Sequence, residues 1–253
     1  MQSDDLIRTQ KRLTELALRA ERSSIYTFSP FLGAAEQDVF YRLVKQEIRT
    51  PVQAFGGVVG CERIMLRFGD PEDLGYEEPF PIQCLKATPV APKFAEALTH
   101  RDVLGALMHL GIERETLGDI VVREEGIYIF VQDKIAPYVL DQLTRVRHTD
   151  LRVELTDDLP EGALFRTEPH LLQAAGERLD AVIAKVYHLS RADAQALFHR
   201  GLVFVGGRQC ESPSREPKPD ETVSVRGYGR FIYRGPQSQT RKGKFNILVD
   251  VYV

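Results

Sequence analysis

Residues 178–227 read RLDAVIAKVYHLSRADAQALFHRGLVFVGGRQCESPSREPKPDETVSVRG. The segment opens with Arg178-Leu179-Asp180 on an apolar stripe of helical spacing, and Ser190-Arg191 starts a second helix. Residues 201–207 then form a strand and a turn, and residues 223–227 form a closing strand. The pattern predicts a small α+β domain in which two short helices pack on a small sheet, with an arginine at each helix start.

The basic residues concentrate at this end of the chain. The 253 residues carry a net charge of −3, whereas residues 177–253 hold 13 Lys and Arg against 8 Asp and Glu, a net charge of +5. Residues 226–245 contain six cations and no acid, interleaved with aromatic residues. Cations neutralise phosphates and aromatic rings stack on bases, so we expect a nucleic-acid partner here. Phe231 and Tyr233 alternate as in a strand, which also favours a place in the core.

The composition indicates a cytoplasmic protein with room for more than one domain. An apolar share of 43% can build cores, and no run approaches the roughly 18 apolar residues of a membrane span. Residues 1–5 are acidic where a signal peptide is basic. Cys61, Cys84 and Cys210 are scattered, which indicates neither a disulfide framework nor a zinc site. We expect a monomer with no metal, no cofactor and no small-molecule substrate.

An N-terminal α/β domain is expected over residues 1–78. Two helices and two strands are predicted, at 4–22, 35–48, 52–55 and 63–68. Thr50-Pro51 follows the second helix, because a residue before proline avoids the helical conformation. The glycine-rich residues 56–60 could cradle a phosphate, but they lack the dinucleotide fingerprint. A plain turn between two strands is the simpler interpretation.

A central domain is expected over residues 79–160, followed by a linker over 161–176 and the basic domain over 177–253. The central elements are predicted in the order β-α-β-β-α-β, at 81–87, 93–110, 119–123, 127–131, 135–145 and 151–155. This order is typical of ferredoxin-like and RNA-recognition (RRM-like) folds. Tyr128 and Phe130 share one strand face. They are candidates for stacking on RNA bases, and a place in the core is an equal alternative.

His100-Arg101-Asp102 resembles the start of a protein-kinase catalytic loop. The metal-binding Asn that such a loop requires is replaced by Leu107, and no glycine-rich phosphate loop occurs. The tripeptide lies in a helical pattern instead. The protein-kinase interpretation is therefore excluded, while His100 and Arg101 remain a candidate second surface for RNA or protein.

Several motifs resemble those of the YlmH-type RNA-binding proteins. They are residues 101–107 (RDVLGAL), 110–112 (LGI), 114–115 (RE), 118–120 (GDI), 55–57 (FGG) and 62–63 (ER). The C-terminal segment resembles the S-four RNA-binding domain, and residues 240–244 are similar to the basic tail of the family. One departure is Val205-Gly206-Gly207, where the family has Val-Asn-Gly. Gly206 has no side chain to contact RNA, although glycine suits the turn.

The resemblance implies a non-enzymatic protein that engages rRNA, tRNA or both on the ribosome. It further implies association with the large subunit, rescue of stalled nascent-chain complexes and a link to cell division. The predicted RNA-binding residues are Arg178, Asp180, Ser190, Arg191, Gln195, Arg200, Gly206, Gly207, Arg208, Arg226, Arg230, Arg241, Lys242 and Lys244. Ser190 is expected to cap the second helix, whose amides would help to hold phosphate.

Two alternatives remain. The chain could be an RNA-modifying enzyme, of the pseudouridine synthase or rRNA methyltransferase class, that uses the basic domain to deliver its substrate. Such enzymes would need a catalytic domain, and the expected domains show no glycine-rich cofactor loop after a first strand. The acidic N-terminal part could also dock on a protein, which is compatible with RNA binding at the other end.

Overall fold

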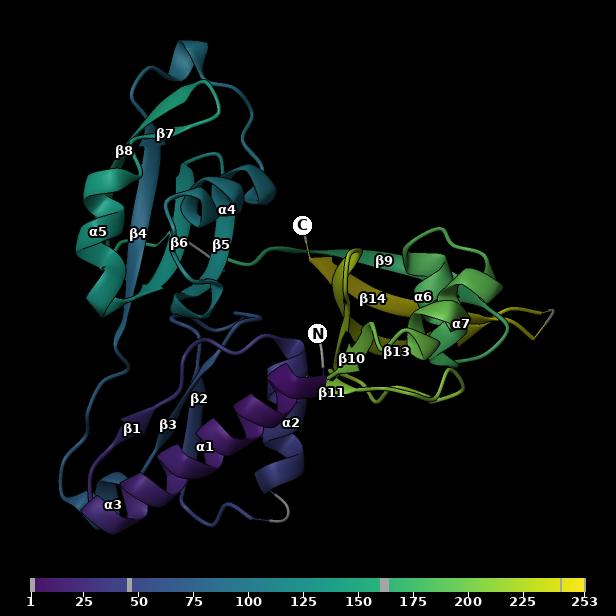
Figure 1. Cartoon of the computed structure of the whole chain (residues 1–253). Helices are drawn as coiled ribbons and strands as arrows, with labels where there is room; N and C mark the ends of the chain where they lie inside the picture. Colours follow the sequence, from purple (N-terminus) through teal and green to yellow (C-terminus); the bar gives the residue numbers. More distant parts are fainter. Residues whose placement is uncertain (1–2, 45–46, 160–163, 242, 253) are drawn as a thin grey trace. The chain divides into compact units, whose positions relative to one another are not determined.

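The computed structural model describes residues 3–44, 47–159, 164–241 and 243–252. Lys242, one of the predicted RNA-binding residues, lies outside these ranges. The chain folds into two compact units, Met1–Leu164 and Phe165–Val253. Both contain helices and sheets, so the predicted α+β class is confirmed (Figure 1).

The N-terminal part of the first unit is a small sheet packed against two helices. Its elements are α1 (Ser3–Ser23), β1 (Thr27–Phe28), α2 (Ala34–Val44), β2 (Val52–Phe55), β3 (Met65–Phe68) and α3 (Pro71–Leu74). The strand order is β1-β3-β2 with antiparallel pairing. Leu13 and Ala17 of α1 and Phe40 of α2 pack on Leu66 and Phe68 of β3. The helical spacing of these apolar residues is what buries one face of each helix.

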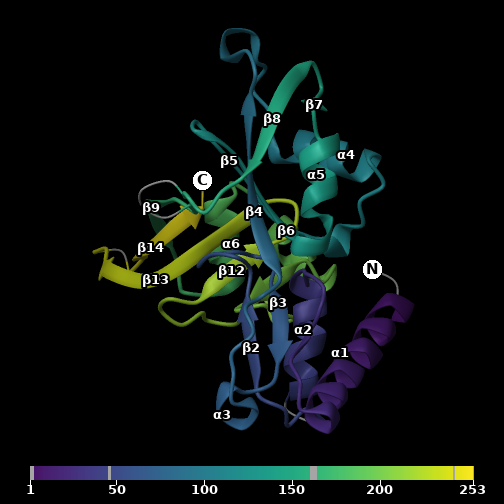
Figure 2. The ribbon, with the colours of Figure 1, turned by 90° about the vertical axis from the view of Figure 1, so that its left-hand side faces the viewer.

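The central part of the first unit forms a second sheet. Its strands are β4 (Ile82–Pro89), β5 (Leu117–Arg123), β6 (Gly126–Gln132), β7 (Arg145–Val146) and β8 (Thr149–Leu155), and its helices are α4 (His100–His109) and α5 (Ala136–Gln142). The order in the sheet is β5-β6-β4-β8-β7, antiparallel throughout. Both helices contribute to one core with the sheet (Figure 2). This arrangement is the split βαβ fold that the sequence pattern predicts.

Both central helices are shorter than expected. Residues 93–99 are excluded from α4 because Thr99 caps it: its side chain accepts a hydrogen bond from the Asp102 amide, and the Asp102 carboxylate accepts one from the Thr99 amide. The second helix ends at Gln142, well before the expected residue 145. Arg145 and Val146 instead pair with residues of β8 as an edge strand.

The C-terminal unit is a six-stranded antiparallel sheet with two helices on one face. It contains β9 (Thr167–Ala174), α6 (Leu179–Val186), α7 (Arg191–His199), β10 (Val203–Val205), β11 (Arg208–Gln209), β12 (Thr222–Val225), β13 (Gly229–Gln239) and β14 (Phe245–Tyr252). The sheet order is β11-β10-β12-β13-β14-β9. Phe231 and Tyr233 are fully buried in the core between sheet and helices, as their alternation predicts.

Two expectations for this unit are wrong. The stretch 161–176 is not only a linker, because Thr167–Ala174 forms β9 and pairs with β14 along its whole length. Pro169 is tolerated because β9 is an edge strand. The described residues of the expected tail, Thr240, Arg241, Gly243 and Lys244, instead lie in the turn that joins β13 to β14. The basic turn is therefore held at the end of a long hairpin.

Candidate nucleic-acid interface

A buried carboxylate organises the start of both helices in the C-terminal unit. Asp180 has no exposed surface, and its side chain accepts four hydrogen bonds. Arg178 donates two of them, from Nε to Oδ1 at 3.2 Å and from Nη2 to Oδ2 at 3.0 Å. Arg191 Nε and Gln195 Nε2 donate to Oδ2 at 3.3 Å and 2.8 Å. Four residues that the sequence singled out are thus brought together by one side chain.

The charge of Asp180 is stabilised by these donors. Burial alone raises the pKa of the carboxyl group, but the hydrogen bonds from Arg178, Gln195 and Arg191 outweigh it and lower the pKa to about 2. The carboxylate is therefore ionised at neutral pH. It forms ion pairs with the guanidinium groups of Arg178 and Arg191, whose side chains are 41% and 56% exposed. The cluster consequently presents one excess positive charge to solvent.

Asp180 is thus a positioning residue and cannot contact RNA itself, which corrects its place among the predicted contacts. Its value to a binding surface lies in the two arginines it orients, because a fixed guanidinium loses less freedom when it meets a phosphate. The α6 amides of Leu179 and Asp180 donate to the carbonyls of Arg215 and Pro213. These two amides are accordingly engaged within the fold.

Ser190 caps α7, as the sequence predicts. Its Oγ accepts a hydrogen bond from the Asp193 amide at 3.1 Å and lies 2.6 Å from the Asp193 carboxylate. The expectation that the amides of this helix start hold a phosphate is weakened by this geometry. The Asp193 amide is already used, and the carboxylate in the first turn would repel an anion.

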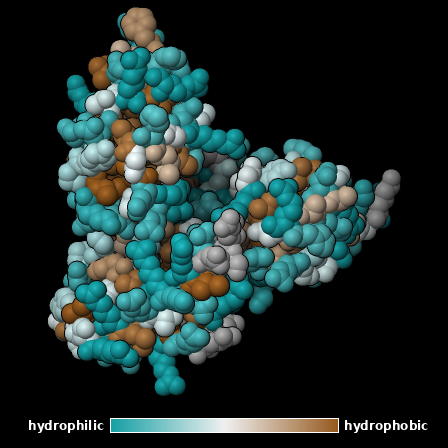
Figure 3. All heavy atoms as spheres, viewed as in Figure 1, coloured by the Kyte–Doolittle hydropathy of each residue, from teal (hydrophilic) through white to brown (hydrophobic). Residues whose placement is uncertain are grey.

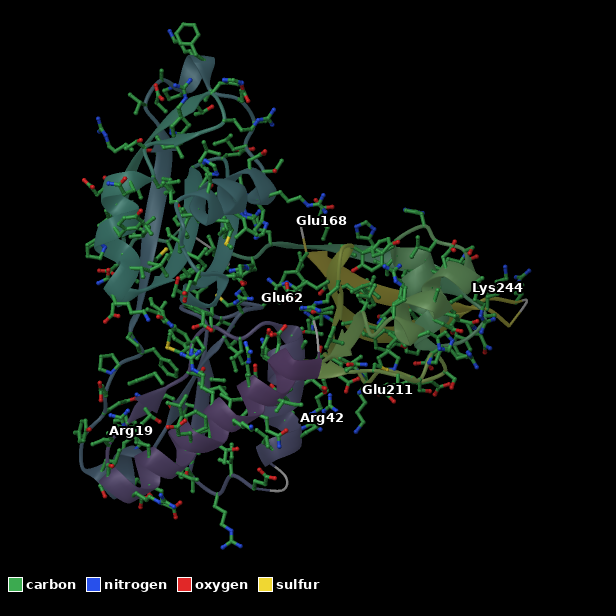
Figure 4. The ribbon with its side chains drawn as sticks, viewed as in Figure 1. Arg19, Arg42, Glu62, Glu168, Glu211 and Lys244 are labelled. Carbon is green, nitrogen blue, oxygen red and sulfur yellow. The ribbon has the colours of Figure 1, made fainter. Side chains whose placement is uncertain are left out.

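A groove lies between α6, the α6–α7 loop and the end of β9. Its volume is about 530 Å³, and Lys185, His188, Arg191 and Lys244 line it together with alanines. Lys244 reaches it from the β13–β14 turn and lies beside the tip of the hairpin (Figure 4). Of these four residues, the sequence prediction contained only Arg191 and Lys244. Lys185 and His188 could not be predicted from the sequence because no local motif includes them. Only the fold brings them beside the hairpin.

A second group of exposed residues lies where β12 turns into β13. Arg226 follows β12, and its guanidinium lies over the ring of Phe204 at 5.8 Å from the centroid. Its amide donates to the carbonyl of Leu202, two residues beyond Arg200 at the end of α7. The ring of Tyr228, which is half exposed, lies 5.5 Å from that of Tyr187. Arg226 and the accessible ring of Tyr228 therefore lie in the same turn, between β12 and β13.

Other cations of the basic segment are engaged within the protein. The Arg230 guanidinium lies between two rings, 4.6 Å from the centroid of Phe165 and 4.0 Å from that of Tyr252. Arg234 forms ion pairs with Asp220 and, at 2.7 Å, with Asp250. The acid-free run 226–245 is therefore not one continuous positive face, because carboxylates distant in sequence reach one of its arginines.

The remaining predicted residues lie in turns. Gly206 and Gly207 have φ values of 56° and 75° and connect β10 to β11, with Val205 and Arg208 paired on either side. A two-residue hairpin of this kind needs positive φ at both positions, which explains the glycines. Arg208 is exposed beside this turn, and Arg241 is exposed at the start of the basic turn. The visible surface of this unit is mostly hydrophilic (Figure 3).

The aromatic pair on the central sheet is not available to stack on bases. Tyr128 and Phe130 are each only 1% exposed. The Lys86 ammonium lies over the Tyr128 ring at 5.6 Å, and Gly57 contacts the Phe130 ring so closely that a Cβ there would lie 2.3 Å from it. The alternative of a core position is therefore the right one. The glycine-rich loop serves this close approach, and its plain-turn interpretation agrees with the fold.

The family motifs of the first unit meet at one seam. The Arg63 guanidinium donates to the carbonyls of Leu117, Phe31 and Arg114 at 2.8 to 3.1 Å. Desolvation, and secondarily the charge of Arg114, lowers the pKa of Arg63 to about 10. The Asp119 carboxylate accepts hydrogen bonds from the amides of Glu62 and Arg63. These motif residues thus join the N-terminal sheet to the central one, which is a structural role.

The candidate second surface lies next to this seam. His100 is exposed at the start of α4, and desolvation, reinforced by the charge of Arg114, lowers its pKa. Arg101 is exposed on the first turn of α4. Nothing in their geometry distinguishes a binding surface, so their role stays a prediction.

Two further findings concern other kinds of site. Within the described ranges, His, Cys, Asp and Glu side chains do not gather in threes closely enough to hold a metal ion. No helix in the described part of the chain combines the length and apolar character that a membrane crossing requires.

Comparisons with known proteins agree with the motifs. Residues 77–158 match the family model described as "Putative RNA-binding domain in YlmH". The ribosome-associated protein quality control protein P2 of Bacillus subtilis (strain 168) is 33% identical over 162 residues, which cover 63% of this chain and 62% of that protein. The chain therefore matches about three fifths of this curated relative. The structure of the cell division protein ylmH from Streptococcus pneumoniae gives a TM-score of 0.49 at 21% identity, covering 62% of this chain and 93% of that one. The family-model match and the curated relative confirm the predicted resemblance to the YlmH-type proteins.

Proposed function

We propose, from this likeness to the YlmH-type proteins, that the chain is a non-enzymatic RNA-binding protein acting on the ribosome. The relative from Bacillus subtilis is named as ribosome-associated and as a quality control protein. By extension, the proposed partners are rRNA and tRNA at the large subunit, the proposed process is rescue of stalled nascent-chain complexes, and the proposed location is the cytoplasm. The proposal also includes a monomeric state and the link to cell division that the resemblance implies.

The observation that carries the proposal is the Asp180 cluster. One buried carboxylate fixes two arginines whose heads remain accessible, and Lys185, Lys244 and Arg226 are exposed in the same unit. This is a preorganised positive surface on two helices and two turns. Phosphate contacts of this kind supply most of the affinity of a protein for RNA and position it on the backbone.

Binding of the full chain to tRNA, to large-subunit rRNA fragments and to duplex DNA tests the proposal. We expect binding to RNA in preference to DNA, with co-sedimentation of the chain with large ribosomal subunits. The matched control is Lys93→Ala, which removes a cation from an exposed 3-10 turn of the first unit. Arg191→Ala should weaken RNA binding about tenfold, and Lys93→Ala should not. Failure of the wild-type chain to bind any RNA would contradict the proposal.

A further inference from the structure

The groove beside α6 is lined by basic groups from three separate segments. Lys185 comes from the last turn of α6, His188 and Arg191 come from the α6–α7 loop and the helix start that follows it, and Lys244 comes from the β13–β14 turn. All four are exposed. Among its described lining residues none is acidic, and the remainder of the lining consists of four alanines, Gln173 and Leu189. The groove therefore offers donors and positive charge together with mostly small side chains.

His188 has an unusual backbone conformation. The helix α6 is closed by hydrogen bonds from the Tyr187 amide to the Ile183 carbonyl and from the Leu189 amide to the Ala184 carbonyl. In such a closure the residue after the helix is left-handed, and His188 has a φ of 54°. Glycine is the ordinary residue there because it takes this conformation without strain. The turn itself thus gains nothing from an imidazole, while the groove gains a hydrogen-bonding ring.

The size and chemistry of the groove define its ligand. A volume of about 530 Å³ holds a small group but no folded partner. Lysine and arginine side chains only donate hydrogen bonds, so the ligand must accept them and carry negative charge. Arg191 is already oriented by Asp180 at 3.3 Å, which suits it to meet a phosphate oxygen. The small side chains of Ala181 and Ala184 let a sugar-phosphate chain approach α6 closely.

We propose that this groove binds one backbone phosphodiester of the RNA, with His188 as a phosphate contact beside Lys185, Arg191 and Lys244. The inference rests on the proposed function and assigns one phosphate contact to the groove beside α6. It also predicts that one substitution, His188→Gly, raises the stability of the protein and lowers its affinity for RNA. Replacing His188 by glycine relieves the left-handed strain and at the same time removes a ligand contact.

The test compares His188→Gly with Ser24→Gly in the full chain. Ser24 has a φ of 49° and lies in the first unit, outside the groove. Both substitutions should raise the melting temperature by a few degrees because both relieve the same strain. Only His188→Gly should lower the affinity for a single-stranded RNA oligonucleotide, by about fivefold to tenfold. An affinity equal to that of the wild type would overturn the groove assignment.

Three further arms complete the experiment. The double variant Lys185→Ala, Lys244→Ala should make the log–log salt slope of RNA binding less steep by about 1.4; an unchanged slope overturns the proposal. Removing a 5′-terminal phosphate from the oligonucleotide should not change the affinity, and a loss would overturn the assignment to a backbone phosphodiester. If the wild-type chain binds no RNA, the proposed function itself fails. If it binds and only Arg226→Ala weakens binding, the groove proposal alone fails.

Discussion

The central sheet and the C-terminal unit both carry sequence patterns that are typical of RNA recognition. They differ in how far the side chains of these patterns are exposed. On the central sheet the aromatic residues Tyr128 and Phe130 are buried, Phe130 under the glycine-rich loop. In the C-terminal unit the arginines of the Asp180 cluster keep about half of their surface exposed. A fold that other proteins use to bind RNA therefore does not by itself identify an RNA-binding surface in this chain. The side chains of such a surface must also be accessible.

The largest expected effect concerns the close contact between the glycine-rich loop and Phe130 of the central sheet. Gly57→Ala would place a Cβ 2.3 Å from the Phe130 ring at a position with a φ of 110°. We expect the free energy of unfolding of the first unit to fall by about 3 kcal/mol or more, measured by denaturant titration. Gly105→Ala in α4 meets no atom within 4 Å and should instead stabilise by about 1 kcal/mol. Similar behaviour of the two variants would contradict the close approach.

A smaller loss is expected at the centre of the C-terminal cluster. Asp180→Asn keeps the size of the side chain but removes its charge, and should lower the free energy of unfolding by about 2 kcal/mol. The folded-state pKa of about 2 lies below the ordinary value of 3.8. The stabilisation is therefore complete above about pH 4 and is lost as the pH falls towards 2.

Stability measured across this pH range checks the assignment. The difference between wild type and Asp180→Asn should be constant from neutral pH down to about pH 4 and should shrink below it. A difference that does not depend on pH would mean that the carboxylate is not held ionised by its arginines.

A third prediction compares two arginines of the basic segment, one exposed to solvent and one paired with carboxylates of the protein. Arg226→Ala should weaken RNA binding about threefold and make the salt slope less steep. Arg234→Ala removes an arginine that is paired with Asp220 and Asp250, and should leave RNA affinity unchanged. Equal losses in the two variants would show that the ion pairs do not withhold Arg234 from RNA.

Local sequence predicts those structural features that have local causes. Ser190 caps α7, Gly206 and Gly207 form a tight turn, and Phe231 alternates into the core. Each follows from a side chain and its immediate neighbours. The order of elements in the central sheet follows from hydrophobic periodicity for the same reason.

What could not be predicted depends on residues distant in the chain. The burial of Asp180 needs Gln195, fifteen residues away, and the strand β9 is defined only by its pairing with β14. Its sequence, with Pro169 and weak alternation, carries little strand signal of its own. Arg234 is paired because Asp250 is its neighbour on β14. Lys185 and His188 join a groove only when the hairpin folds back beside α6.

The smallest expected effect concerns the turn that departs from the family. Gly206 has a φ of 56° and open space around its missing side chain. Asparagine tolerates this conformation, so Gly206→Asn should change the free energy of unfolding by less than about 0.5 kcal/mol. We expect RNA affinity to rise by about twofold through an added amide contact. A marked loss of stability on thermal unfolding would contradict the geometry of the turn.

The dependence of RNA affinity on salt tests most directly whether the C-terminal unit meets the RNA backbone. For about four neutralised phosphates of a single strand, the logarithm of the affinity should fall with the logarithm of salt concentration with a slope near −3. In a variant with alanine at positions 185, 191, 226 and 244, the slope should approach zero. A flat wild-type slope, or a variant slope that stays near −3, would place the contact elsewhere and contradict the account.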